Sequence, residues 1–365
     1  MRNVLDDLTR WHDHGIAAAV GRVVAVDGSS PRQPGAALAV DASGVIIGSV
    51  SGGCVEAAVV QAAQASILDG VRGVHSFGYS DDDAFGVGLT CGGTVHVYVE
   101  PFDWPEIAAE LHDSLNGGSP VALATVVQGR FVGAKALVRA DGTMAGSVGG
   151  PELTRAVRRD ALGELAAGRT AMRRYGCSGQ AQHDDVAVFV ESFVAPPRMI
   201  ILGAADFTAA LVNTAKLLGF HVTVCDARAA FATQARFPAA DEVLVERPQR
   251  LLARIGPTLG PPDAVCVLTH DHRFDVPAIA EALRTNVGYL GAMGSRRTNA
   301  ERAGRLRADG VTKEALARLH GPIGLDLGAT TPEETAISIC AEVIAARTGR
   351  NEIRPLRSGE GPIHS

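Results

Sequence analysis

Residues 199–208 read MIILGAADFT, a short apolar run followed by a glycine and then by a helical pattern. A continuous apolar run of this length is typical of a strand that is buried on both faces of a parallel sheet. A helix is predicted from Asp206 to Leu218, with Gly219 suited to its C-terminal cap, and a second strand from His221 to Asp226. Strand, glycine turn, helix and strand together predict a Rossmann-type unit that begins near Pro196.

The strand–helix alternation continues beyond this first unit. Apolar runs predict strands at 242–245, 264–269 and 287–290, and helical spacing predicts helices at 248–255 and 276–283. A last helix is predicted from Thr331 to about Ala346, because Thr331, Pro332 and Glu334 suit an N-cap, a first helical position and a capping box. This order predicts a Rossmann-like domain with a parallel sheet at 196–350, followed by a flexible tail at 351–365.

The first half of the chain contains a degenerate internal repeat. Residues 40–50 read VDASGVIIGSV and residues 138–148 read VRADGTMAGSV, 98 positions further on. Each copy predicts a strand, a glycine-containing turn, a strand, a helix and two more strands. The sequence therefore predicts an N-terminal α/β domain at 1–195, with repeat copies at about 16–102 and 120–194. The prolines at 196 and 197 suit a linker, because consecutive prolines cannot continue a helix or a central strand.

Composition narrows the class of protein. The 365 residues are 46% hydrophobic and 20% charged, which is typical of a globular protein. The net charge of -6 argues against broad binding to nucleic acid or to anionic membranes. No apolar run reaches the roughly 20 residues that a membrane span requires, and the first residues lack a signal core. The six cysteines are widely spaced, so a reducing cytoplasm is the expected compartment.

The turn after the first Rossmann strand departs from the dinucleotide fingerprint. Of the three glycines in Gly-x-Gly-x-x-Gly, the sequence keeps only Gly203. Ala205 places a methyl group where a pyrophosphate would approach, and Asp206 adds a negative charge there. Asp226 lies where a ribose-binding acid is expected. The pattern favours the fold but disfavours bound NAD(P), and Asp206 could equally be a plain N-cap of a scaffold domain.

Two later loops also follow predicted strands. His270, Asp271, His272 and Asp275 lie where open α/β sheets bind ligands. They could hold a metal ion or move protons, and the histidines could equally be solvated capping residues.

Residues 291–297 read GAMGSRR and open a basic helix. Gly294, Ser295, Arg296 and Arg297 could form a phosphate-binding site, or the arginines could be an ordinary exposed face. The glycine-rich loop at 320–329 precedes the last helix and is expected beside the same pocket.

A cysteine motif in the first repeat copy is the most specific feature. Residues 48–56 read GSVSGGCVE, which places Cys54 in the predicted first turn of a helix. The helix dipole there favours the thiolate. Ser51, Gly52 and Gly53 are candidate cofactor-binding residues, since the two glycines are expected to leave backbone N–H groups open. Glu56 could relay a proton or simply cap the helix.

A second cysteine motif follows in the same copy. Residues 88–93 read GLTCGG, in which Cys91 is followed by Gly92 and Gly93, two further candidate cofactor-binding residues. If packing required these cysteines, both repeat copies would be expected to have them, but the second copy lacks both. Cys54, Glu56 and Cys91 are therefore the candidate catalytic residues, and the two cysteines are candidate metal contacts. A disulfide between them stays open.

These motifs resemble those of the XdhC/CoxI family, accessory proteins of xanthine dehydrogenase and carbon monoxide dehydrogenase. The resemblance runs over nearly the full length. It rests on GSVSGGCVE at 48–56, LTCGG at 89–93, THDH at 269–272, GAMGSRRT at 291–298 and HGPIGLDLGA at 320–329. Five separate motifs in one order make a chance likeness improbable. The sequence departs from many relatives at 203–208.

The resemblance implies a chaperone more than a catalyst with its own turnover. Such a protein binds molybdenum cofactor, as molybdopterin or its cytosine dinucleotide form, and assists its sulfuration and insertion into a xanthine dehydrogenase-type hydroxylase. The implied partners are that molybdenum hydroxylase and a cysteine desulfurase, and a homo-oligomer stays open. Soft thiolates at Cys54 and Cys91 suit molybdenum and its sulfido group. The alternatives are an NAD(P)-dependent oxidoreductase that uses Asp226 and the histidine loop, and a metal-dependent enzyme or sensor built on His270 and His272.

Overall fold

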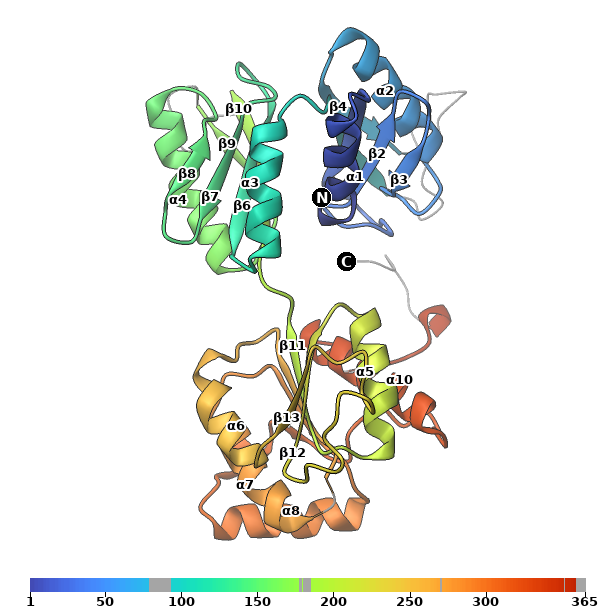
Figure 1. Ribbon diagram of the computed structural model, residues 1–365, viewed down its shortest axis with the longest axis vertical. Helices are drawn as coiled ribbons and strands as arrows, with labels where there is room; N and C mark the ends of the chain where they lie inside the picture. The colour runs from blue at the N-terminus through green and yellow to red at the C-terminus, as the bar shows by residue number, and fades with distance from the viewer. Residues whose placement is uncertain (79–92, 177–178, 180–184, 270, 351, 359–365) are drawn as a thin grey trace. The chain divides into compact units, whose positions relative to one another are not determined.

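The computed structural model describes residues 1–78, 93–176, 179, 185–269, 271–350 and 352–358. The chain divides into two compact units, here called unit 1, which contains Met1–Ala195, and unit 2, which spans Pro196–Pro355 (Figure 1). Among the described residues, no helix is both long and apolar enough to cross a membrane. Most of the predicted flexible tail lies outside the described residues, and Leu356–Ser358 forms a short 3-10 helix within it.

Unit 1 contains the same arrangement of elements twice. The first copy consists of α1 (Arg2–Asp13), β1 (Ala18–Asp27), β2 (Ala37–Asp41), β3 (Ile46–Gly48), α2 (Glu56–Asp69), β4 (Gly73–Phe77) and β5 (Thr94–Pro101). The second consists of α3 (Pro105–Asn116), β6 (Val121–Gln128), β7 (Lys135–Arg139), β8 (Met144–Gly146), α4 (Pro151–Ala166), β9 (Ala171–Tyr175) and β10 (Val186–Phe193). The sheet orders β3-β2-β1-β5-β4 and β8-β7-β6-β10-β9 are identical, which confirms the predicted internal repeat.

Each copy packs a helix on one face of its sheet. Helix α2 covers the first sheet, and α4 covers the second, through buried aliphatic side chains. The opening helices α1 and α3 were not predicted, although α1 has a regular apolar face of Val4, Leu5, Leu8 and Trp11. Both helices contribute to one core that also contains strands of both copies.

A buried charge cluster also joins the two copies. The guanidinium of Arg22 donates to Glu100 at 2.8 Å and to Glu191 at 2.7 Å, and the Lys135 ammonium donates to Glu100 at 2.6 Å. Thr125, which takes the place of Arg22 in the second copy, accepts a further bond from Arg22. Burial lowers the pKa of Lys135 to about 8, against the attraction of Glu100. Each charge has a partner, as burial requires.

Unit 2 is a doubly wound parallel sheet, as predicted. Its elements are β11 (Arg198–Leu202), α5 (Asp206–Leu217), β12 (His221–Asp226), β13 (Glu242–Val245), α6 (Pro248–Ile255), β14 (Ala264–Val267), α7 (His272–Leu283), β15 (Tyr289–Ala292), α8 (Arg296–Ala308), α9 (Lys313–Leu316), β16 (Leu319–His320) and α10 (Pro332–Arg347). The strand order is β13-β12-β11-β14-β15-β16, and α5 packs beside α10 on one face (Figure 1). The order reverses between β11 and β14, where Rossmann folds bind ligands.

Candidate functional site

The cysteine motif of unit 1 forms a loop around one carboxylate. Glu56 accepts hydrogen bonds from the Ser49 hydroxyl at 2.6 Å and from the backbone amides of Ser51, Gly52 and Gly53 at 2.9, 3.0 and 2.8 Å. The Ser51 hydroxyl also donates to it. The prediction that Gly52 and Gly53 leave their N–H groups open is therefore wrong, because Glu56 takes both.

These bonds define what Glu56 can do chemically. Burial raises the pKa of Glu56, but the hydrogen bonds from the hydroxyls of Ser49 and Ser51 and from the loop amides outweigh this effect. The net result is a pKa lowered to about 2. A carboxylate that stays ionised at neutral pH and has its oxygens filled by donors is a poor proton relay. Glu56 instead anchors the loop before α2, and it does not cap the helix, because Ser51, Gly52 and Gly53 precede the N-cap Val55 and α2 has no side-chain cap.

Cys54 lies within this anchored loop. It precedes the N-cap Val55 of α2, so it stands just before the helix and not in its first turn, where the sequence predicted it. Its side chain is half-buried and packs against the core of the first copy. Gly52 and Gly53 have φ of +79° and +124°, which a side chain would strain. The glycines thus serve the backbone path that presents Cys54.

The second repeat copy lacks the carboxylate, and its helix begins at a different position. Thr154 stands 98 positions after Glu56, and α4 begins at Pro151, the counterpart of Gly53. The helix therefore begins three residues earlier in the second copy than α2 does in the first. Glu56 binds the amides of Ser51, Gly52 and Gly53, and of these only Gly53 corresponds to a position inside α4, where the second copy has Pro151. The two copies therefore differ in two ways at the start of the helix: the first has a carboxylate that binds the preceding loop, and it has a glycine where the second has a proline at the first helical position.

The other half of the predicted cysteine site is only partly described. Cys91 and Gly92 lie outside the described residues, so their contact with Cys54 stays a prediction. Gly93 is buried, and a Cβ there would lie 2.2 Å from the backbone oxygen of Ser29. Close packing of two backbones thus accounts for Gly93 without a ligand.

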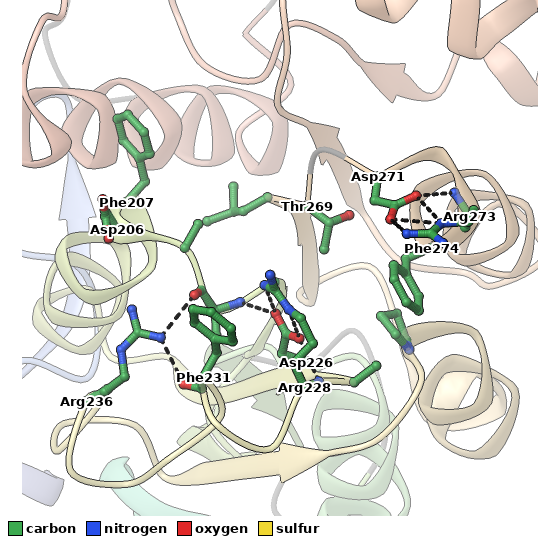
Figure 2. Close-up of a pocket in the computed structure, with 16 residues that line it drawn as sticks. Asp206, Phe207, Asp226, Arg228, Phe231, Arg236, Thr269, Asp271, Arg273 and Phe274 are labelled. Carbon is green, nitrogen blue, oxygen red and sulfur yellow. Dashed lines mark hydrogen bonds and ion pairs between the residues drawn. The ribbon is translucent and has the colours of Figure 1, made fainter.

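A cavity of about 730 Å³ lies in unit 2 beyond the carboxyl ends of β11, β12 and β14 (Figure 2). Gly203, Asp226, Thr269 and Asp271 line it, together with three arginines and three phenylalanines. This is the crevice where the strand order reverses, the usual ligand site of the fold. Its size is in the range of small-molecule sites.

The turn at this cavity retains one glycine for a structural reason. Gly203 has φ of +114°, and a Cβ there would lie 2.8 Å from the Thr269 backbone nitrogen. Ala205 is the N-cap of α5, and Asp206 is the first helical residue and exposed, so the interpretation of Asp206 as the N-cap is wrong. Its carboxylate stands at the positive end of the helix, where a pyrophosphate would bind.

Asp226, the predicted ribose-binding acid, is already engaged. It accepts the Ala204 amide at 2.8 Å and three N–H groups of Arg228, one backbone and two side-chain, at 2.8–2.9 Å. Burial raises the pKa of Asp226, but the Arg228 guanidinium and these amides have the larger effect, so the net pKa is lowered. A ribose hydroxyl could bind Asp226 only by displacing Arg228.

The histidine motif is dispersed. Asp271 caps α7 by accepting the Arg273 amide at 2.9 Å, and His272 is the exposed first residue of that helix. His270 lies outside the described residues. Among the described part of the chain, no group of three or more His, Cys, Asp or Glu side chains could hold a metal ion.

Asp275 has a structural partner that the sequence did not reveal. The guanidinium of Arg302 donates to Asp275 at 2.8 Å, to Asn299 at 2.5 Å and to the Met293 carbonyl at 3.0 Å. Thr269 also donates to Asp275. This buried pair ties the loop after β14 to the loop after β15. The only sequence signal was Asn299 and Arg302 spaced three apart on an otherwise exposed basic helix.

The predicted phosphate loop lies away from the large cavity. Ser295 caps α8 by accepting the Thr298 amide at 3.1 Å. The side chains of Arg296 and Arg297 are 87% and 88% exposed and pair loosely with Asp326 and Glu301. Neither arginine lines the cavity beside Asp226, and Arg296 instead borders a smaller one of about 310 Å³. The structure therefore does not bring these arginines to the first turn.

Comparison with known families matches both units. The chain matches the XdhC Rossmann domain over residues 199–343. It matches the XdhC and CoxI family over residues 11–78 and 114–176, which fall in the two repeat copies.

Comparison with individual proteins agrees. The chain is 28% identical over 336 residues to a probable xanthine dehydrogenase subunit of Bacillus subtilis, covering 90% of this chain and 93% of the relative. It is 33% identical over 89 residues to the molybdenum cofactor insertion chaperone PaoD of Escherichia coli, covering 24% of this chain and 28% of the relative. A solved structure of a xanthine dehydrogenase from Bacillus halodurans superposes with a TM-score of 0.72 at 25% identity, covering 96% of this chain and 97% of that one.

Proposed function

This chain belongs to the XdhC and CoxI family, and we propose that it binds molybdenum cofactor and assists its sulfuration and insertion into a xanthine dehydrogenase-type molybdenum hydroxylase. The relatives named for xanthine dehydrogenase and for cofactor insertion support an accessory role beside such an enzyme. We propose a cysteine desulfurase as the second partner.

The observation that carries the proposal is the anchored cysteine loop. One repeat copy has Cys54 on a glycine backbone path held by Glu56, and the other has neither the thiol nor the carboxylate. A thiolate is a soft ligand that suits molybdenum and its sulfido group. Cys54 would contact the cargo, Glu56 would keep the thiol in place, and the exposed glycines at 52 and 53 would leave access from solvent. The cofactor supplies its redox chemistry only in the client enzyme.

The test is co-purification. The full chain is expressed with a candidate molybdenum hydroxylase, the two are purified together, and the bound fraction is analysed for pterin and molybdenum. The proposal expects both proteins and the cofactor in one fraction. A hydroxylase that is loaded and active to the same extent without this chain would overturn it.

The oxidoreductase alternative makes a different prediction. An NAD(P)-dependent enzyme should bind NADH at the crevice of unit 2. The exposed Asp206 and the engaged Asp226 argue against this. Titration with NADH separates the two, since micromolar binding would favour the oxidoreductase.

A further inference from the structure

Among the described residues, one cationic side chain of the unit 2 cavity has no carboxylate partner. Arg236 lines the cavity, and within the described part of the chain its guanidinium donates only to the carbonyls of Ala204 at 3.3 Å and Phe231 at 3.2 Å. No carboxylate of the described residues lies within 4 Å of it. By contrast, Arg228 pairs with Asp226 at 2.8 Å, and Arg273 pairs with Asp271 at 2.6 Å. A guanidinium in a cavity with neutral partners only is a natural anion site.

Aromatic side chains flank the same space. The Arg228 and Arg236 guanidinium carbons lie 4.2 and 5.4 Å from the ring centroid of Phe231, which is 41% exposed. Phe274, half-buried on α7, lies on the opposite side of Asp226 from Phe231 (Figure 2). Flat apolar walls with arginine beside them suit a planar heteroaromatic ring.

The same cavity disfavours the usual dinucleotide. A pyrophosphate would meet the Asp206 carboxylate and the Ala205 methyl at the start of α5. A ribose diol would find the oxygens of Asp226 filled by Arg228 and the Ala204 amide. What the described residues leave available is one guanidinium, Arg236, with aromatic surface beside it.

We propose that this cavity binds a planar heteroaromatic ring bearing a single phosphate monoester, with the phosphate on Arg236 and the ring against Phe231 and Phe274. Molybdopterin carries a single phosphate monoester, and the pyrimidinone ring of its reduced pterin is planar, whereas its dinucleotide form carries the pyrophosphate that the turn disfavours. The choice of a pterin as the ring rests on the proposed function. The preference of the cavity for a flat ring with one phosphate rests on its own residues and is independent of that function.

The test titrates the full chain with neopterin monophosphate, with neopterin and with NADH. The monophosphate should bind about tenfold or more tightly than neopterin, because the charged hydrogen bonds to Arg236 need the phosphate. Arg236→Ala should remove that advantage, and Arg236→Lys should restore part of it. Arg305→Ala, an exposed arginine on α8 away from the cavity, is the matched control and should change nothing. Circular dichroism checks that each variant is folded.

Two results would overturn the inference. One is monophosphate binding that is equal in wild type, Arg236→Ala and Arg236→Lys. The other is NADH binding tighter than the monophosphate. Failure of the proposed function looks different: the chain would bind neopterin monophosphate through Arg236 yet never co-purify with molybdenum cofactor. Conversely, cofactor binding that is indifferent to Arg236 would leave the chaperone role standing and remove this site.

Discussion

Glu56 and Thr154 occupy the same position in the two repeat copies, and the helix begins three residues earlier where the residue is threonine. Two differences accompany this shift: Glu56 binds the amides of Ser51, Gly52 and Gly53, and Gly53 stands where the second copy has the proline that begins α4. The carboxylate thus stabilises the loop that contains Cys54.

Glu56→Thr should therefore rebuild the second copy's geometry in the first. Helix α2 is expected to begin near Gly53, which would place Cys54 where the second copy has Glu152, whose side chain is 64% exposed. Labelling of Cys54 by iodoacetamide, followed by mass spectrometry, should accelerate about threefold or more, since a half-buried thiol becomes accessible. Thr154→Val is the control and should leave the rate unchanged. An unaltered rate in Glu56→Thr would show that the carboxylate does not hold the loop.

The same carboxylate predicts an acid-side effect on stability. Because the pKa of Glu56 is lowered to about 2 from its usual 4.5, its stabilising effect is present above pH 4.5 and is lost as the pH falls through 2. Urea unfolding of wild type and Glu56→Gln at pH 7, 4 and 2.5 measures this. The difference in the free energy of unfolding should shrink steadily toward pH 2. A difference that is constant over this range would contradict an ionised anchor.

Lys135 should make the free energy of unfolding depend on pH on the alkaline side. Its pKa in the fold is about 8, below the ordinary 10.5, so the folded state releases the proton first and stability should rise between pH 8 and 10.5. Lys135→Met should abolish this rise. Urea denaturation across this pH range tests this prediction, and an alkaline rise that persists in Lys135→Met would assign it to another group.

The Arg302–Asp275 pair predicts non-additive energetics. Replacing either residue alone, as Arg302→Met or Asp275→Asn, should destabilise the protein by about 3–5 kcal/mol, since one buried charge loses its partner. The double variant should be destabilised by less than the sum of the two single effects. Thermal or urea unfolding of the four proteins completes the cycle. Additive losses would mean that the pair does not couple the loops after β14 and β15.

The sequence pattern was sufficient for the architecture where local spacing determines it. The run 199–208 predicted the Rossmann order, and the 98-residue offset predicted a repeat whose two sheets have identical strand orders. The apolar face of α1 is also evident in the sequence, but the helix was not predicted because it precedes the first strand of the repeat. Boundaries shifted by a few residues, as for α7, which begins at His272 rather than at 276.

Side-chain partners across the fold could not be predicted in the same way. The motif at 48–56 identified Glu56 and Cys54, but not that the carboxylate would take the amides of the glycines. Asp226 was placed correctly at the end of its strand, yet its occupation by Arg228 depends on the path of the chain after β12. Arg22 and Glu191 lie 169 positions apart, so only the packing of the two repeat copies brings them together.

The most direct test of the central claim is the pterin and molybdenum content of the purified chain in three forms: wild type, Cys54→Ala and Glu152→Ala. Glu152 is the second copy's counterpart of Cys54 and stands at the start of the corresponding helix, α4. Wild type and Glu152→Ala are expected to retain equal amounts of cofactor, and Cys54→Ala is expected to lose most of it while remaining folded. Equal retention in all three would contradict the assignment of Cys54 as the cofactor contact.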